Sequence, residues 1–162
     1  MRNTPISESY WVAPSQFLAG PFPSVTNQDI QHLQFERMLN MNLTCIVNLL
    51  DPDHTDSHRP RLHHYSDTYR QQALQMGLPF LYFEYPLMNY GIPETREMID
   101  ILDTIDSALK ENHGVYLHCW KGMGRTGTVV GCYLVRHSLV NVTNILKKIQ
   151  GLRSGLVSSR FI

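Results

Sequence analysis

Short apolar runs alternate along the chain with longer amphipathic segments, and this alternation predicts strands and helices in turn. The runs are rich in β-branched and aromatic residues, which favours buried strands at 10–12, 17–19, 43–50, 79–85 and 115–117. The longer segments predict helices at 27–40, 66–76, 93–113, 126–138 and from Asn141 or Thr143 onward. Strands that alternate with helices predict an α/β fold whose central, mostly parallel sheet is flanked by helices on both faces.

Residues at the ends of these segments predict where the helices begin and end. Thr26 is suited to cap the first helix, whose buried face we expect to contain Ile30, Leu33 and Met38. Gly114 is expected to end the third helix. The chain has no internal repeat, low-complexity tract or long linker, so we expect a single domain over residues 1–162.

The composition narrows the classes of function. Of 162 residues, 43% are apolar and 17% charged, and 14 basic side chains balance 14 acidic ones. A net charge of zero argues against bulk binding to nucleic acid or to an anionic membrane, and no apolar run approaches the roughly 20 residues of a membrane span. The charge is uneven, because residues 1–110 carry 7 basic and 13 acidic side chains (−6) and residues 111–162 carry 7 and 1 (+6). We therefore expect a local site for a small anion in the second part.

The cysteines indicate a reduced protein. Cys45, Cys119 and Cys132 form neither a disulfide framework nor a CxxC pair, and the N-terminus leads into no apolar segment typical of a signal peptide. We expect a cytoplasmic monomer. The polar loop at 51–64 holds several His and Asp residues, but their spacing is not that of a metal site on a helix. A solvated loop is favoured there, and no metal or other cofactor is expected.

The segment HCWKGMGRTG at 118–127 carries the most specific chemistry, since it lies between a predicted strand and a predicted helix. In an α/β sheet that junction lies at the carboxyl edge, where ligands bind. Gly122 and Gly124 allow a tight loop whose backbone N–H groups face inward, next to a helix N-terminus that favours anions. The same field stabilises a thiolate at Cys119, and Arg125 is placed to hold two phosphate oxygens.

This segment resembles the HCxxGxxR[ST]G signature of the cysteine-dependent protein tyrosine phosphatases, especially their dual-specificity branch. The resemblance extends to residues 11–20 before the segment and to 136–137 and 152–157 after it. It implies that Cys119 is the nucleophile and forms a phosphocysteine, that Arg125 clamps the phosphate, and that Thr126 supports the thiolate. It also implies a structural role for His118, and phosphate binding by Trp120, Lys121, Gly122, Met123, Gly124 and Arg125.

The pattern breaks at the position of the general acid, which the family places on a loop about thirty residues before the nucleophile. Residues 86–93, PLMNYGIP, fit the P-x-x-D-x-x-x-P frame of that loop, but they hold Asn89 where the family has Asp. An amide has no proton to give at useful pH. A general acid is typically worth about 10²–10⁴-fold, so its loss slows an enzyme without abolishing the activity.

Three interpretations of Asn89 remain open. The acid could come from another side chain: Glu84, Glu94, Asp51 or Asp53. The enzyme could be restricted to good leaving groups, such as the phenolate of phosphotyrosine or a pyrophosphate. The protein could be a phospho-binding pseudophosphatase with weak turnover, or a chain whose acid has been removed by mutation. We favour an active phosphatase without a strong general acid.

A second departure lies near the C-terminus, where the family often has a Gln that places the hydrolytic water. No Gln follows Gly155 in this chain. The resemblance therefore implies either slow hydrolysis of the phosphocysteine or a truncated chain.

Side chains in and around the loop bear on the substrate and on redox chemistry. Trp120 either lines the mouth of the site or packs on the protein surface, and Lys121 supplies one charge. We expect phosphotyrosine, or phosphoserine and phosphothreonine, in proteins. Phosphoinositides, inositol phosphates and RNA 5′-phosphates are the alternatives. Cys45 is a weak candidate for a disulfide with an oxidised Cys119, whereas Cys132 is expected in the core.

Overall fold

The structure is a computed structural model that describes residues 4–23, 27–51, 65–88 and 91–155. Its strands are β1 (Tyr10–Ala13), β2 (Phe17–Gly20), β3 (Cys45–Leu50), β4 (Leu81–Leu87) and β5 (Val115–His118). Its α-helices are α1 (Gln28–Asn40), α2 (Tyr65–Gln75), α3 (Thr95–Lys110), α4 (Gly124–Arg136) and α5 (Ile145–Ser154), and a short 3₁₀ helix, η2 (Val142–Asn144), precedes α5. The strand and helix types predicted from the sequence are confirmed, with boundaries displaced by one to four residues at most of the ends.

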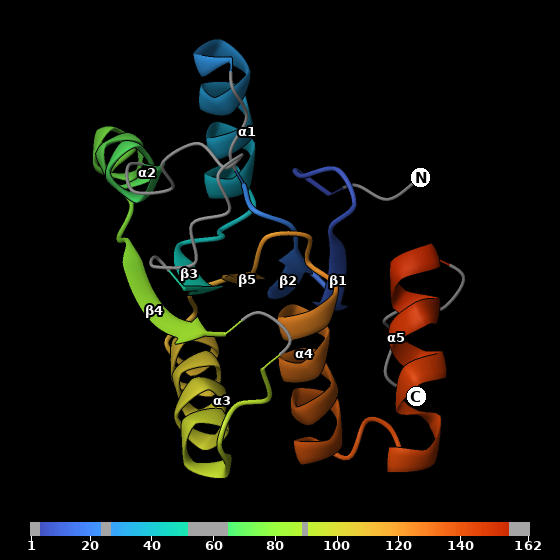
Figure 1. Ribbon diagram of the computed structural model, residues 1–162. Coiled ribbons are helices and arrows are strands. Elements are labelled where there is room, and N and C mark those ends of the chain that lie inside the picture. The colour runs from blue at the N-terminus through green and yellow to red at the C-terminus, as the bar shows by residue number, and fades with distance from the viewer. Residues whose placement is uncertain (1–3, 24–26, 52–64, 89–90, 156–162) are drawn as a thin grey trace.

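The five strands form one sheet in the order β1-β2-β5-β3-β4. The pair β1–β2 is antiparallel, and the pairs β2–β5, β5–β3 and β3–β4 are parallel. Helices α1 and α2 cover one face, and α3, α4 and α5 cover the other (Figure 1). The predicted α/β class, with a mostly parallel sheet and helices on both faces, is therefore confirmed.

Each face of the sheet packs its own core. Alternate residues of the central strands point to opposite faces, as the two-residue period of a strand requires. On β5, Val115 and Leu117 pack against α3, α4 and α5, whereas Tyr116 packs with Phe35 and Tyr69 of α1 and α2. Both cores are fully buried, which holds the parallel strands in register and aligns their carboxyl ends.

Of the three residues predicted on the buried face of helix α1, only Met38 is buried, so the helix is turned from the predicted orientation. Ile30 and Leu33 are 54% and 58% exposed, whereas Phe35, Met38 and Leu39 are buried. The helix is capped by Asn27, whose side-chain oxygen accepts a hydrogen bond from the Ile30 N–H at 3.1 Å. Thr26, the predicted cap, lies outside the described residues.

Gly114 has another role than the predicted one of ending a helix. Helix α3 ends at Lys110, and Asn112 takes the left-handed conformation with φ 64°. A Cβ atom at Gly114 would lie 2.4 Å from the carbonyl oxygen of Asn42. Gly114 is therefore required because two backbone segments approach closely where they enter β3 and β5.

Candidate active site

The loop from Cys119 to Met123 joins β5 to α4 at the carboxyl edge of the sheet, where the sequence predicted it. Cys119 is 3% exposed, so its thiol lies below the surface. Gly122 has φ +70°, and a Cβ atom there would lie 2.4 Å from the carbonyl carbon of Gly20. A side chain is excluded at Gly122 both by its backbone conformation and by this contact, which seats the loop on the end of β2.

Four carbonyl groups of this loop are held by hydrogen bonds from its surroundings. The Cys119 oxygen faces Nδ1 of His118 at 3.2 Å, and the Trp120 oxygen accepts from the N–H of Phe22 at 3.0 Å. The oxygens of Gly122 and Met123 accept from the Arg153 guanidinium at 3.4 and 2.7 Å.

These bonds decide where the loop's N–H groups point. In a planar trans peptide the C=O of one residue and the N–H of the next point in opposite directions. The N–H groups that follow the four engaged carbonyls therefore turn away from His118, Phe22 and Arg153. They belong to Trp120, Lys121, Met123 and Gly124, and all four of these residues line one cavity together with Cys119. Converging backbone N–H groups beside a helix N-terminus favour an anion such as phosphate.

His118 is held as a neutral ring beside Cys119. Its Nε2 lies 2.5 Å from the hydroxyl of Tyr65, the first residue of α2. Burial lowers the pKa of His118 to about 3 and raises the pKa of Tyr65 well above its usual range. The partner of Nδ1 is the carbonyl oxygen of Cys119, which can only accept a hydrogen bond, so Nδ1 carries the ring proton. Nε2 is then the acceptor and receives the hydrogen bond from the Tyr65 hydroxyl. The predicted structural role of His118 thus has a partner, Tyr65, that the sequence analysis missed because nothing in its local pattern marks it.

Arg125 lies in the first turn of α4 and is 6% exposed. Its Nη1 donates to the carbonyl oxygen of Leu87 at 3.0 Å, which ties the guanidinium to the last residue of β4. One nitrogen is thus fixed by the backbone, and the group lines the same cavity as Cys119. This fixed orientation suits a bidentate contact with two oxygens of a phosphate group.

Arg153 is the second arginine of the site and stands behind the loop. It comes from the last turn of α5, and its guanidinium lies over the ring of Tyr10, 5.7 Å from the centroid. A Cβ atom at Gly127 would lie 2.6 Å from its Nη2. Arg153 lies within a segment of family resemblance, but its role cannot be predicted from the sequence, because only the packing of α5 against α4 brings it to the loop.

The cavity has a volume of about 380 Å³. Its lining residues are Gly91, Ile92, Cys119, Trp120, Lys121, Met123, Gly124, Arg125 and Thr128. Five of the predicted phosphate-binding residues therefore lie at one cavity with the nucleophile. The sixth, Gly122, supports the loop from behind.

No carboxylate is among the described residues that line this cavity. Asn89, at the predicted acid position, lies outside the described residues, as does Asp53. Glu84 accepts a hydrogen bond from the Tyr82 hydroxyl at 3.0 Å, and neither it nor Glu94 or Asp51 is part of the lining. Leu87 before Asn89 contacts Arg125, and Gly91 after it lines the cavity, so both flanks of the predicted acid position lie at the site.

Two predicted contacts of the loop turn out differently. The Thr126 hydroxyl is buried and makes no hydrogen bond within the described part of the chain, so the expected bond to the Cys119 sulfur is not formed. Trp120 lines the cavity, and its ring also stacks on Phe22, with centroids 5.5 Å apart and planes inclined by 27°. The two alternatives for Trp120, mouth of the site or packing on the protein, are therefore combined.

The structure argues against a disulfide between Cys45 and Cys119. Cys45 opens β3 and pairs with Val115 at the start of β5, whereas Cys119 follows the end of β5. Four residues of strand separate the two positions by about 13 Å, roughly twice the Cα separation that a disulfide spans. Burial raises the pKa of Cys45 to about 12, which disfavours its thiolate further. Cys132, expected in the core, is half-buried on α4 and packs against the core.

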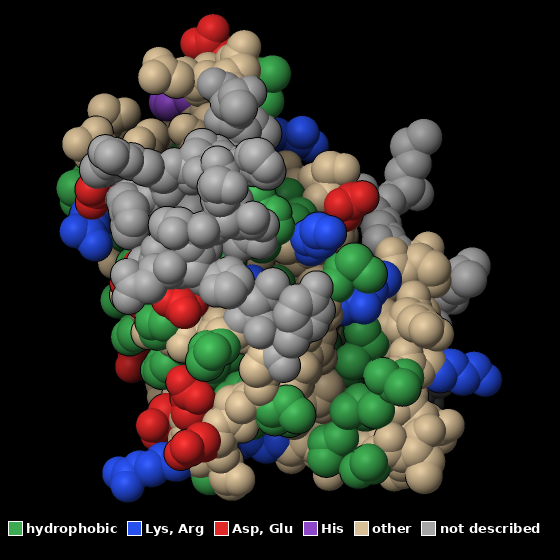
Figure 2. All heavy atoms as spheres, viewed as in Figure 1, with side chains coloured by type: hydrophobic (Ala, Val, Ile, Leu, Met, Phe, Trp, Pro, Cys, Tyr) green, Lys and Arg blue, Asp and Glu red, His purple; other side chains and the backbone are tan. Residues whose placement is uncertain are grey.

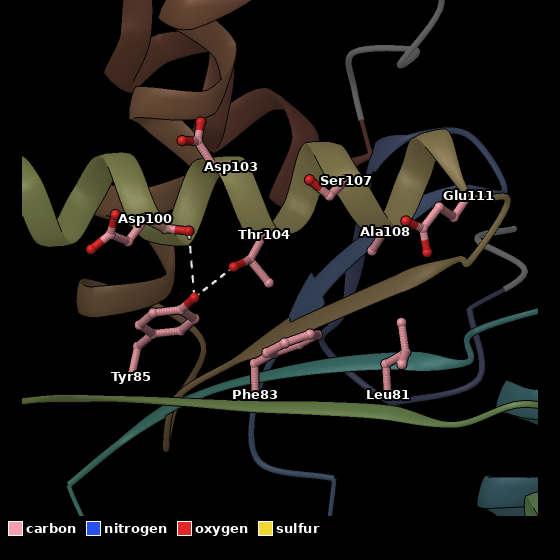
Figure 3. A pocket seen from close by; sticks show the side chains of 9 residues that line it. All are labelled: Leu81, Phe83, Tyr85, Asp100, Asp103, Thr104, Ser107, Ala108 and Glu111. Carbon is pink, nitrogen blue, oxygen red and sulfur yellow. Dashed lines mark hydrogen bonds between the residues drawn. The ribbon is translucent and has the colours of Figure 1, made fainter.

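A larger cavity, of about 620 Å³, lies elsewhere, between β4 and α3. Figure 3 shows its floor of Leu81, Phe83 and Tyr85, with the Tyr85 hydroxyl directed at Asp100 and Thr104. Its lining contains three carboxylates but no cysteine and no basic side chain. Among the residues that the structure describes, no cluster of His, Cys, Asp and Glu could hold a metal ion, and no helix has the length and hydropathy of a membrane span. Residues 52–64 of the predicted polar loop at 51–64 lie outside those residues.

The chain matches known proteins in sequence. A family model described as "Polymorphic toxin system, DSP-PTPase phosphatase" matches residues 24–139. Among curated proteins, the chain is 26% identical over 127 residues to "Protein tyrosine phosphatase domain-containing protein 1" of Bos taurus, covering 77% of this chain. It is 32% identical over 62 residues to "Dual specificity protein phosphatase CDC14B" of Mus musculus, covering 38% of this chain. The chain spans only 16% and 12% of the lengths of these two relatives.

The fold also matches solved structures. The structure described as "Crystal structure of Tk-PTP in the active form" superposes with a TM-score of 0.65 over 92% of this chain and 86% of that chain, at 18% sequence identity. At that identity the likeness bears on the fold, and it agrees with the sheet and helices described above.

Proposed function

The chain belongs to the family of DSP-PTPase phosphatases described for polymorphic toxin systems, and on that premise we propose that it hydrolyses phosphate monoesters through a phosphocysteine on Cys119. The observation that supports this most is the orientation of the loop. Its carbonyls are bound from outside, so its N–H groups converge with Arg125 on the cavity that contains Cys119. A phosphate dianion repels a thiolate, and this array offsets that repulsion.

The proposed reaction has two steps. The Cys119 thiolate attacks phosphorus, so that a P–S bond forms while the P–O bond to the leaving group breaks. The loop N–H groups and Arg125 stabilise the charge on the three equatorial oxygens. Water then attacks phosphorus and the P–S bond breaks, which releases inorganic phosphate and restores the thiolate.

Phosphotyrosine in proteins is the substrate that we propose, with phosphoserine and phosphothreonine as poorer ones. The described lining of the cavity offers no carboxylic acid to protonate a leaving oxygen. A phenolate has a pKa near 10 and departs with less proton transfer than an alkoxide. The depth of the site also favours a long phosphorylated side chain, because Cys119 and Arg125 are 3% and 6% exposed.

The proposal is tested by hydrolysis of an aryl phosphate such as p-nitrophenyl phosphate in the presence of a chelator. We expect turnover by the natural protein and its loss, by at least about 10³-fold, in Cys119→Ser, because a hydroxyl at neutral pH is a much weaker nucleophile. Cys132→Ser is the matched control, since that thiol lies outside the phosphate cavity. Equal loss in both variants would contradict the role of Cys119.

A phospho-binding protein with weak turnover is the second candidate, and the same missing acid favours it. The two candidates differ in turnover but not in binding. The binding protein would be favoured if the natural protein binds inorganic phosphate but hydrolyses aryl phosphate no faster than Cys119→Ser does.

The acid position has its own prediction. Asn89→Asp should raise kcat on alkyl phosphates by about 10- to 100-fold, and raise it less on activated aryl phosphates, because only the poor leaving group needs the proton. Rates measured for both substrates and both proteins check this. Asn89→Ser is a control that changes the side chain without adding an acid. Unchanged rates on both substrates would show that residue 89 is not the acid position.

We also propose that the protein acts as a monomer in the cytoplasm. Its three cysteines are free thiols, which a reducing compartment preserves. Light scattering of the purified protein and fractionation of the producing cells test the two parts of this proposal separately.

A further inference from the structure

An apolar cleft lies between α4 and α5, next to the candidate active site. It has a volume of about 360 Å³ and is lined on one side by α4 and on the other by Ile145, Leu146 and Ile149. Figure 2 shows hydrophobic side chains gathered along the boundary of these two helices. A solvent-exposed apolar cleft beside a candidate catalytic site is typical of a ligand-binding surface.

The cleft and the phosphate cavity share a wall. Met123, Gly124 and Thr128 line both of them. Met123 is 60% exposed, and Thr128 donates its hydroxyl hydrogen to the Gly124 carbonyl at 3.1 Å. When the phosphate of a substrate is bound by the loop N–H groups, the part of the substrate next to the phosphate is therefore separated from the cleft only by this shared wall.

Glycines on α4 shape the cleft. A Cβ atom at Gly131 would lie 2.9 Å from Cδ1 of Ile145, so this glycine lets α5 approach α4 at that end. Gly127 makes room for the guanidinium of Arg153 at the other end. Between these two contacts Leu146 remains 74% exposed, which is costly for a leucine in water and is relieved when a ligand covers it.

We propose that this cleft is a specificity subsite, which accepts an apolar side chain lying close in sequence to the phosphorylated residue of a peptide substrate. The inference rests on the proposed phosphatase function and adds to it the class of substrate. It also accounts for the orientation of Leu146, which packs on neither of the two cores.

A peptide fits the cleft better than a lipid does. Its volume is near the lower end of the roughly 300–1,000 Å³ of small-ligand pockets, enough for one or two side chains but not for paired acyl chains. Its lining is partly polar, because it includes Thr128, Gln150 and Arg153 together with the apolar residues. Such groups suit the main-chain amides that accompany a peptide side chain, whereas an acyl chain would leave them uncovered.

The test uses phosphotyrosine peptides with a glycine and serine background and one leucine at each position from two before to two after the phosphotyrosine. We expect the peptide with leucine at one of these positions to have a kcat/KM about three- to tenfold higher than that of the leucine-free peptide. The gain is modest because the cleft buries only part of the leucine side chain. In Leu146→Gln this ratio should fall to about one. Leu74→Gln should keep it, because Leu74 is a similarly exposed leucine, at 68%, on α2 across the sheet.

The outcomes separate this inference from the function on which it rests. The dissociation constants of the same peptides are measured on Cys119→Ser, so the preference is seen even where turnover is slow. No preference at any position, or a preference that survives Leu146→Gln, would overturn the subsite. Faster, Leu146-dependent hydrolysis of phosphoinositide vesicles than of any peptide would overturn it in favour of a lipid. Loss of aryl phosphate hydrolysis alone would bear on the proposed function and not on the cleft.

Discussion

Arg153 is the residue on which the shape of the phosphate loop depends most. Its guanidinium holds two successive carbonyls, those of Gly122 and Met123, and is supported by the ring of Tyr10. Both bonds come from one nitrogen, Nη2, whose two N–H groups have directions fixed by the planar guanidinium, whereas the ammonium of a lysine rotates freely. Arg153 is therefore a positioning residue, which acts on the substrate through the loop N–H groups.

Substitution of Arg153 should separate catalysis from stability. Arg153→Lys keeps the charge but loses the fixed N–H directions of Nη2, so we expect kcat on an aryl phosphate to fall by about tenfold and the inhibition constant of inorganic phosphate to rise by a similar factor. Steady-state kinetics with phosphate as inhibitor check this. Arg136→Lys is the matched control, since that arginine pairs with Asp103 on the surface. A variant with natural kcat and natural phosphate affinity would disprove the positioning role.

The helices of this chain show that an amphipathic pattern identifies a helix more securely than its buried face. In α1 the apolar residues occur on more than one side, and Ile30 and Leu33 have the same spacing signal as Phe35 and Met38. Contact with α2 decides between them, because Phe35 packs against Tyr69 of that helix, with ring centroids 4.8 Å apart. A pattern with two apolar sides leaves this choice to the partner element.

This difference predicts unequal stabilities for two alanine variants of α1. Phe35→Ala should lower the free energy of unfolding by about 3–5 kcal/mol, since it empties a fully buried site. Leu33→Ala should change it by less than about 0.5 kcal/mol, because that side chain is 58% exposed. Urea denaturation of both variants measures the two values, and similar losses would contradict the observed orientation of the helix.

At the scale of the whole molecule, the parallel sheet assembles the site from segments that are distant in sequence. The loop rests on the end of β2, Arg125 is anchored at the end of β4, and Cys119 directly follows β5. Helix α2 adds Tyr65 from the other face, and α5 adds Arg153. His118 lies where these parts meet, so the protonation of its ring is coupled to folding.

Stability should therefore depend on pH through His118. The ring has a pKa near 6.5 in the unfolded chain and about 3 in the fold, because burial disfavours its charge. Between these values the unfolded state binds the extra proton, so this contribution is complete above about pH 6.5 and is lost as the pH falls, by at most about 1.4 kcal/mol per pH unit. Urea titrations from pH 7 to 5 should show a shallower decline for His118→Gln. Tyr65→Phe leaves the His118 ring buried, so it should show the same dependence of unfolding free energy on pH as the natural protein. Equal slopes for the natural protein and His118→Gln would refute the coupling.

The sequence by itself determined the chemistry of the loop and the class of the fold. The residues from His118 to Gly127 lie in one short segment between a strand and a helix, so their spacing alone brings Cys119 and Arg125 together. The alternation of strands and helices likewise requires no distant contact to be recognised. These features depend on residues that are close together in the chain, and such local relations can be recognised from the sequence.

Only the tertiary structure decided what holds the loop in shape and what lies beside it. Tyr65 and Arg153 reach the site from 53 residues before His118 and from 30 residues after Met123. The same packing places Cys45 at the far end of β5 from Cys119 and opens the cleft of Leu146 beside the phosphate cavity. These arrangements depend on how helices pack on the sheet, and that packing is set by the summed contacts of both cores and not by any local pattern.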